Sequence, residues 1–311
     1  MNKHHATKIS LIIALLIAGA VSISAAYIED REAAMKLKRQ GETEAALEAF
    51  QKMAEADVTE VQKSDALEQA VLCLIKMKDY ENAKEKADQI PIQGVSDLCH
   101  MRILNAQGKH KAIIEQFGDA KINEWPPMWR GHGYVLRGNA AHRTGKGELA
   151  ASDLEEAMVY AATFGNLKHD KSRALNALGQ IYRDLLKDDE KAIDAFRRAQ
   201  QVGANSKGTR ATFAIADIYL EQDKPDKAVA VVKDWTEKVT PQSFGSAYWQ
   251  KSLLTGAVRV FVAADRKEEA VAACKEALAA DKIKPKVKDY CRKKLAELQG
   301  KDAGAENDGE K

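Results

Sequence analysis

Histidine and cysteine are the side chains of this sequence best suited to catalysis or metal binding, and neither occurs in a recognised pattern. The chain contains no His-Glu-x-x-His, no Gly-x-Ser-x-Gly and no phosphate-binding loop ending in Gly-Lys-Ser/Thr. His132 and His142 fall nearly on one face of a helix, but no carboxylate accompanies them. The sequence therefore predicts neither an enzyme nor a bound cofactor or metal.

The four cysteines, Cys73, Cys99, Cys274 and Cys291, leave two interpretations open. In an exported chain an even number favours disulfides, and neighbouring helices would allow Cys73–Cys99 and Cys274–Cys291. Alternatively, they are small buried apolar side chains, which suits Cys274 best because it belongs to an apolar helix pattern. No two cysteines have the Cys-x-x-Cys spacing of zinc or redox sites.

The helices that must position any binding residues are indicated by an apolar triplet at spacing i, i+4, i+7. Its members share one helix face and begin with a short or branched residue, where another helix can approach. Repetition every 30 to 42 residues is typical of a solenoid, in which each unit buries its apolar face against its neighbours. The triplets are Ala46-Phe50-Met53, Ala83-Ala87-Ile90, Ile113-Phe117-Ala120, Ala150-Leu154-Ala157, Ala192-Phe196-Ala199, Ala228-Val232-Trp235 and Ala270-Cys274-Ala277.

The repeated unit resembles the tetratricopeptide repeat, a family of helix-turn-helix units. The best stretch is Ala174-Leu-Asn-Ala-Leu-Gly-Gln-Ile-Tyr182, followed by the triplet that begins at Ala192. The resemblance implies an all-α fold: an α-α superhelical solenoid of about seven tetratricopeptide-like helix pairs over residues 27–299, the last helix being a polar cap. Turn formers stand five residues before most triplets: Gly41, Gly108, Gly145, Asp223 and Asp265, with Lys78 as the exception.

The resemblance also implies a binding surface, because the first helix of each tetratricopeptide pair lines the concave groove. Arginine binds carboxylates through two parallel hydrogen bonds, so we expect a mildly basic groove that binds an acidic or extended protein segment. Asn139 and Arg210 fall on positions of the family's carboxylate clamp, but Val135, Ala177 and Ala214 do not supply its other groups. The alternative is that each arginine pairs with an acid on an adjacent repeat. The selected groove positions are Asn139, Arg143, Arg173, Asn176, Arg183 and Arg210.

The segment Trp125-Pro-Pro-Met-Trp129 lies between the third and fourth pairs and cannot be helical throughout. One interpretation is an exposed aromatic contact for a partner, made by Trp125 and Trp129. The other, which we favour, is that both indoles fill the space left by the short third pair.

The N-terminal sequence predicts export. Lys3, His4, His5 and Lys8 precede an apolar run that ends in small residues near Ala26. Residues 1–26 are thus expected to be either a cleaved signal peptide or, through residues 9–26, a membrane anchor. Both place the remainder outside the cytoplasm, in the periplasm or attached to the membrane. Residues 300–311 lack large apolar side chains and are predicted to be a disordered polar tail.

The charge balance argues against nucleic acid as a partner. The chain has 48 basic and 46 acidic residues, for a net charge of +2, whereas nucleic-acid-binding proteins usually have a clear basic excess. We therefore expect an exported or membrane-anchored bacterial envelope scaffold that binds a protein and contacts the membrane only through an uncleaved N-terminal segment. Two alternatives remain: an accessory domain of a cell-wall or polysaccharide assembly system, and a structural protein that self-associates as a homo-oligomer.

Overall fold

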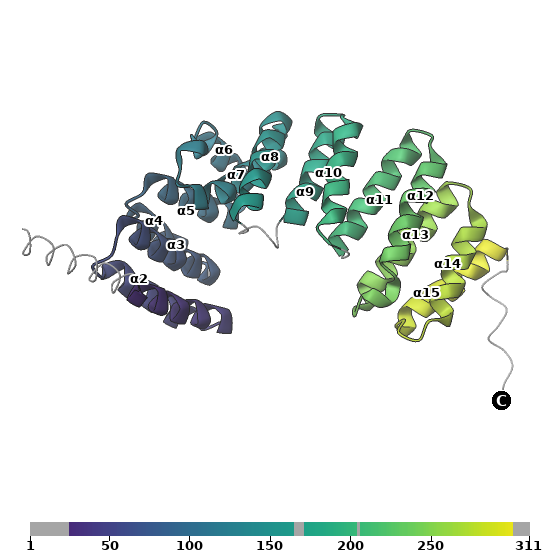
Figure 1. The fold of residues 1–311 in the computed structure, drawn as a ribbon, viewed down its shortest axis with the longest axis horizontal. Coiled ribbons are helices and arrows are strands. Elements are labelled where there is room, and N and C mark those ends of the chain that lie inside the picture. Colours follow the sequence, from purple (N-terminus) through teal and green to yellow (C-terminus); the bar gives the residue numbers. More distant parts are fainter. Residues whose placement is uncertain (1–24, 165–170, 204–205, 301–311) are drawn as a thin grey trace, which may run out of the picture. The chain divides into compact units, whose positions relative to one another are not determined.

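The structure is a computed structural model that describes residues 25–164, 171–203 and 206–300, including the side chains except those of 161–164. Every described secondary-structure element is helical, which confirms the all-α prediction (Figure 1). The helices group into two compact units, the first ending at Lys146 and the second beginning at Gly147. Each unit is described separately below.

The first unit consists of successive antiparallel helices. Its first helices pack side by side, α3 against α5 and α5 against α7, while α2, α4 and α6 pack against the first helices that follow them. The described helices are residues 25–40, α2 (Thr43–Glu55), α3 (Glu60–Met77), α4 (Tyr80–Asp88), α5 (Gln93–Ala106), α6 (His110–Phe117), the short turn η1 (Ile122–Glu124) and α7 (Pro127–Arg143).

The second unit repeats this plan. Helices α9, α11 and α13 are the first members of its pairs, and each packs against the next first helix in the chain. The predicted polar cap is confirmed as the helix that packs on α13 and α14. The described elements are α8 (Gly147–Phe164), α9 (Lys171–Gln180), the π-helical turn η2 (Ile181–Leu185), α10 (Asp189–Gln201), α11 (Ser206–Glu221), α12 (Pro225–Lys238), η3 (Pro241–Ser243), α13 (Ala247–Ala263), α14 (Lys267–Ala279) and the capping helix α15 (Pro285–Gln299).

The apolar triplets form the core of both units. In six of the seven, all three side chains are buried. The triplet that starts at Ile113 departs from the pattern because α6 ends at Phe117, so that Phe117 is half-buried and Ala120 lies beyond the helix. The prediction that the third pair is irregular is thereby confirmed.

The turns between paired helices share a left-handed residue. The five predicted turn formers and the exception, Lys78, all have φ between 55° and 90°. Lys187 occupies the same conformation, with φ 56°, in the pair where the sequence shows no turn former. A left-handed residue lets its backbone N–H bond to carbonyls of the last helical turn, so the hydrogen bonding of the turn outweighs the strain of a lysine there.

Both indoles of the Trp125–Trp129 segment are buried, which corrects the interpretation as an exposed aromatic contact. Trp125 is 6% exposed and Trp129 is 2% exposed. The Trp125 ring lies between Gly94 of α5 and Gly133 of α7, where a Cβ on either glycine would come within 2.5 Å of it. The segment therefore fills the space left by the short α6.

The four cysteines are free thiols and all are buried, so the disulfide interpretation is not realised in this structure. The interaction with the neighbouring Cys291 thiol of α15 and burial both raise the pKa of Cys274 on α14.

Among the helices of the described ranges, none is both long enough and apolar enough to cross a bilayer. The expected signal peptide or anchor lies outside the described residues except for Ala25 and Ala26, which are helical. The predicted polar tail lies outside them except for Gly300.

Candidate functional site

The residues selected for a groove fall in both units. Asn139 and Arg143 lie on α7 in the first unit, whereas Arg173, Asn176, Arg183 and Arg210 lie on α9, η2 and α11 in the second. The structure thus brings the last four onto neighbouring first helices.

In the first unit, a buried carboxylate ties the N-terminal helix to α3. The Arg31 guanidinium donates to both oxygens of Asp65, at 2.5 and 3.0 Å. The Tyr27 hydroxyl donates to the same carboxylate at 2.8 Å. Burial and the adjacent Asp65 charge raise the pKa of Tyr27. Because Asp65 is only 8% exposed and its partners surround it, this group fastens helices together.

A second buried carboxylate connects three first helices. Glu68 of α3 accepts from the guanidinium of Arg102 on α5 and from the indole Nε1 of Trp129 on α7, the latter at 2.7 Å. Glu68 is 5% exposed. The sequence reasoning missed both carboxylates, although two acids three residues apart within the apolar run of α3 were an available signal of a paired, buried position.

On α7, Asn139 is half-buried and Arg143 is exposed. Burial and the charge of Arg143 lower the pKa of the neighbouring His110. The two predicted contact residues of the first unit therefore remain predictions, with Arg143 the more accessible.

In the second unit, Arg183 forms an ion pair with Glu221 of α11. Together with Asp184, Lys187 and Asp189 these two residues line a polar pocket of about 410 Å³ where η2 and α11 end. The alternative interpretation, that an arginine pairs with an acid of the adjacent repeat, therefore holds for Arg183. Because its guanidinium is paired within the chain, Arg183 is the less available residue for contacting a ligand.

Asn176 has a positioning role that the sequence did not reveal. It is 6% exposed, and its amide nitrogen donates to the Ser172 carbonyl at 2.7 Å and to the Lys207 carbonyl at 3.3 Å. The second bond joins α9 to the first turn of α11. The expectation that Asn176 contacts a ligand is therefore corrected: its side chain is buried and holds two helix starts side by side.

Four basic side chains lie near the N-termini of α9 and α11. Lys171 and Arg173 belong to the first turn of α9 and Lys207 to the first turn of α11, and Arg210 begins the second turn of α11. Arg173 and Arg210 are exposed, and Arg210 takes part in no ion pair with any described residue. We call these four residues the basic first turns.

This charge pattern opposes the usual preference of helices. The N-terminus of a helix carries a partial positive charge, so acidic residues there stabilise and basic residues destabilise. The second helices of the second unit, α8, α10, α12 and α14, all have acids in their first turn. The first helices α9, α11 and α13 have none. At the basic first turns, side-chain and dipole fields therefore add, which favours an anion.

Residues 172–202, which form α9, η2, α10 and the following residue, match the family model of the tetratricopeptide repeat. The structure is also similar to the C-terminal part of a TPR repeat-containing protein from Cytophaga hutchinsonii, with a TM-score of 0.53 and 20% identity over 83% of this chain and 98% of that one. The chain has the tetratricopeptide fold. A second similar structure is pilF of Pseudomonas aeruginosa, with a TM-score of 0.48 and 15% identity over 75% of this chain and 99% of that one. No curated protein matches the sequence.

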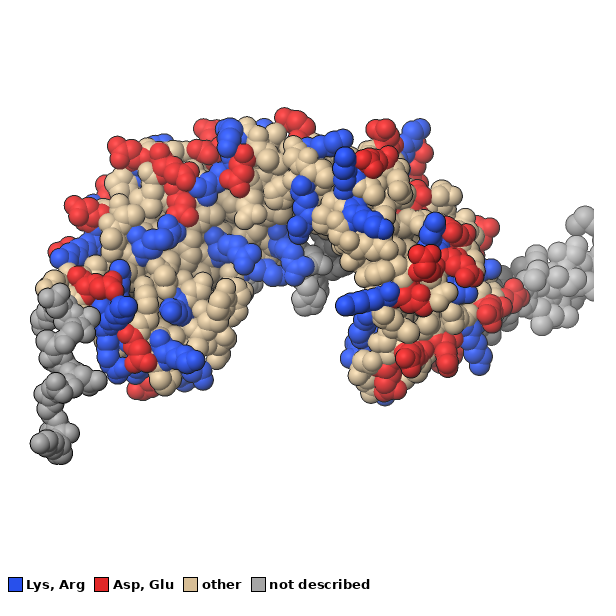
Figure 2. Space-filling model, turned by 180° about the vertical axis from the view of Figure 1, so that it is seen from behind, with Lys and Arg blue, Asp and Glu red and all other residues tan. Residues whose placement is uncertain are grey.

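The tetratricopeptide fold gives the basic first turns a functional context. Solenoids of this kind present extended surfaces for binding other proteins. On the face shown in Figure 2, basic and acidic side chains are interspersed over both units. Within the described ranges, no three His, Cys, Asp or Glu side chains are grouped so that they could hold a metal ion.

Proposed function

We propose that the protein is a scaffold that binds an acidic segment of another protein at the basic first turns of α9 and α11. The observation that carries this proposal is the placement of Lys171, Arg173, Lys207 and Arg210 near the starts of two adjacent helices whose described first turns contain no acid. Basic charge at such a position adds to the positive end of the helix dipole, so a bound anion interacts favourably with both. Carboxylates of a partner would bind the guanidinium groups and the helix dipoles together.

The proposed surface is formed in advance of binding. Asn176 ties the first turn of α11 to α9, and Thr212 donates to the Gly208 carbonyl at 3.0 Å within α11. The indole N–H of Trp235 on α12 donates to the Thr209 hydroxyl at 3.1 Å and so connects the same turn of α11 to α12. A surface held in this way loses little conformational entropy when a ligand binds.

The test is the binding of a fluorescein-labelled glutamate-rich peptide, followed by fluorescence anisotropy. Arg173→Glu combined with Arg210→Glu should weaken binding at least about tenfold, because each change replaces an attraction by a repulsion. The affinity of the wild type should fall with added salt, because the interacting charges are exposed. Circular dichroism should show unchanged helicity in the variant.

A matched control makes the same change of charge elsewhere in the second unit. Lys267 and Lys275 are exposed on α14, form no ion pair with any residue that the structure describes, and lie outside the basic first turns. Lys267→Glu combined with Lys275→Glu should leave binding of the peptide nearly unchanged. If both double variants bind the peptide as well as the wild type, the basic first turns are not the binding surface.

The place of action remains part of the proposal. A basic start followed by an apolar run supports export, with residues 1–26 as a signal peptide or anchor and the scaffold in the bacterial envelope. Mass spectrometry of the protein isolated from its own cells tests this: loss of residues 1–26 supports a signal peptide. An intact N-terminus in the membrane fraction supports an anchor, and an intact soluble protein in the cytoplasm excludes both.

A further inference from the structure

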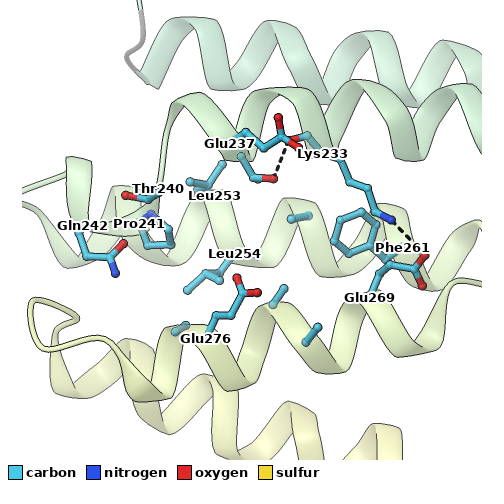
Figure 3. Close-up of a pocket in the computed structure, with 15 residues that line it drawn as sticks. Lys233, Glu237, Thr240, Pro241, Gln242, Leu253, Leu254, Phe261, Glu269 and Glu276 are labelled. Atoms are coloured by element: carbon cyan, nitrogen blue, oxygen red, sulfur yellow. Dashed lines mark hydrogen bonds and ion pairs between the residues drawn. The ribbon is translucent and has the colours of Figure 1, made fainter.

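A second possible binding surface lies among α12, α13 and α14. A cavity of about 520 Å³ opens there, a size typical of ligand pockets. Its floor is formed by α13 with Leu254, Ala257 and Phe261 (Figure 3). On the side of α14, small residues such as Ala273 and Ala277 line it. The lining is thus mainly apolar, and none of its residues belongs to the basic first turns.

The cavity arises from an irregular connection. Among the connections that the structure describes in full, three join a second helix to the next first helix by four or five residues, whereas the eight residues 239–246 join α12 to α13. The other long connection, residues 118–126, carries Ile122 and Trp125, and both are buried in the space it creates. In residues 239–246, Val239 and Phe244 pack against Trp235 and Leu253, while Thr240, Pro241 and Gln242 border the cavity. This connection thus fills part of the space that it creates and leaves a cavity beside it.

The open connection is nevertheless held in place. Gln250 of α13 is 1% exposed and donates to the Phe244 carbonyl at 2.9 Å and to the Lys282 carbonyl at 3.0 Å. The turn itself is closed by a bond from the Ser243 N–H to the Thr240 carbonyl at 2.9 Å. The cavity therefore does not depend on a loose loop for its shape.

The rim of the cavity is acidic. Lys233 of α12 is paired with Glu269 of α14 at 3.3 Å, which closes the end next to Phe261. Glu237 on α12 and Glu276 on α14 form no ion pair with any described residue, and Figure 3 shows the Glu276 carboxylate beside Leu254. Two uncompensated carboxylates thus flank an apolar floor.

We propose that this cavity binds an apolar side chain of a partner protein's amphipathic helix that carries lysine or arginine on either side of the anchor. The apolar floor accepts the anchor, and the carboxylates of Glu237 and Glu276 on opposite walls attract the basic flanks. This preference is opposite in sign to that of the basic first turns. The two surfaces share no residue, and Arg173→Glu with Arg210→Glu should leave peptide binding at the cavity unchanged.

The test uses a fluorescein-labelled amphipathic helix built of leucine and lysine, with fluorescence anisotropy on the purified full chain. Two further peptides separate the contributions: one has glutamate in place of lysine and the other has serine in place of leucine. Because the glutamate peptide is also an expected ligand of the basic first turns, the three peptides are compared on the Arg173→Glu/Arg210→Glu variant. There the leucine–lysine peptide should bind as it does to the wild type, and both others should bind at least about tenfold more weakly.

Substitutions at the rim and in the wall of the cavity test whether the leucine–lysine peptide binds there. Glu237→Lys with Glu276→Lys should weaken the leucine–lysine peptide about tenfold by reversing the rim charge. Ala273→Phe should have a similar effect by occupying the cavity. Glu190→Lys with Glu268→Lys makes the same change of charge on exposed residues of α10 and α14 outside the cavity and should leave binding unchanged.

Three results would overturn the proposal. One is equal binding of the leucine–lysine peptide by the wild type and by an Ala273→Phe variant that retains its helical circular dichroism. Another is an equal loss in the rim and control double variants, which would indicate unspecific attraction to acidic surface. The third is self-association that light scattering detects in the wild type and not in Ala273→Phe, because the occupant would then be a second copy of the chain.

Discussion

Single residues chosen from the sequence as ligand contacts turned out to hold helices together in several cases. Trp129 donates a hydrogen bond to Glu68, and Arg183 forms an ion pair with Glu221. The Asn176 amide donates a hydrogen bond to the backbone of α11. Each is polar or aromatic and lies on a first helix, as a contact residue would. Sequence position defines the helix face of a residue, but not whether the next helix reaches its side chain. Arg173 and Arg210 remain as accessible candidates because α9 and α11 expose them.

Buried thiols make the stability of the fold sensitive to alkaline pH. Burial raises the pKa of Cys99 on α5, so the folded state keeps a proton that the unfolded chain releases above about pH 8.5. A folded-state pKa above the unfolded value gives stability that is complete below the unfolded pKa and is lost as pH rises. We predict that the free energy of unfolding decreases between pH 7 and pH 10, and that Cys99→Ala reduces this decrease by about 1–2 kcal/mol. Urea denaturation at both pH values measures it.

A control for this prediction removes volume without removing a titrating group. Val95 is buried on the same helix, so Val95→Ala should lower stability at both pH values and keep the decrease of the wild type. If Cys99→Ala and Val95→Ala show the same dependence on pH, ionisation of Cys99 does not contribute to it.

At the scale of the helices, the apolar triplets and turn formers predicted the paired elements, and the polar helical pattern of residues 284–299 predicted the cap. They succeeded because burial at helical spacing and left-handed turn residues are local requirements of each pair. The early end of α6, the π-helical turn η2 and the connection over residues 239–246 could not be predicted in detail. These depend on which side chain fills a space between helices, and such packing is a tertiary property.

The packing of Trp125 between α5 and α7 gives a test at this scale. Where the added methyl group has space, replacing a glycine inside a helix by alanine should stabilise the protein by about 0.5–1 kcal/mol. At Gly133 of α7, however, a Cβ would lie 2.4 Å from the Trp125 ring. We therefore predict that Gly133→Ala destabilises the protein by about 1–3 kcal/mol, as overpacked cores do. Urea denaturation followed by circular dichroism measures the change.

The matched control is Gly245→Ala in the connection between α12 and α13. No atom lies within 4 Å of its Cβ position, and its φ is outside the left-handed region. This variant should change stability by less than about 0.5 kcal/mol or raise it slightly. A rise in the unfolding midpoint of Gly133→Ala would show that α5 and α7 separate easily enough to accept the methyl group.

At the scale of the whole molecule, the sequence predicts a solenoid over residues 27–299 and contains no Ser/Gly-rich linker. The structure groups its helices into two compact units that meet between Lys146 and Gly147. The boundary has no sequence signal, because Gly145 forms the same left-handed turn there as Gly41 and Gly108 do within other pairs. The same left-handed turn residue can thus occur within a compact unit and at the boundary between two units.

This division predicts how a local defect spreads. In a solenoid each repeat contacts only its neighbours, so a destabilising change loses its effect with distance along the array. Gly133→Ala weakens the packing of α5 against α7, and we predict faster amide hydrogen exchange in α3, α5 and α7. Exchange in α12, α13 and α14 should stay at the wild-type rate, because these helices pack within the second unit. Hydrogen exchange followed by peptide mass spectrometry measures both regions in one sample. An equal increase in both regions would mean that the chain opens as one cooperative body, and the two units would then be compact in contacts but not separate in stability.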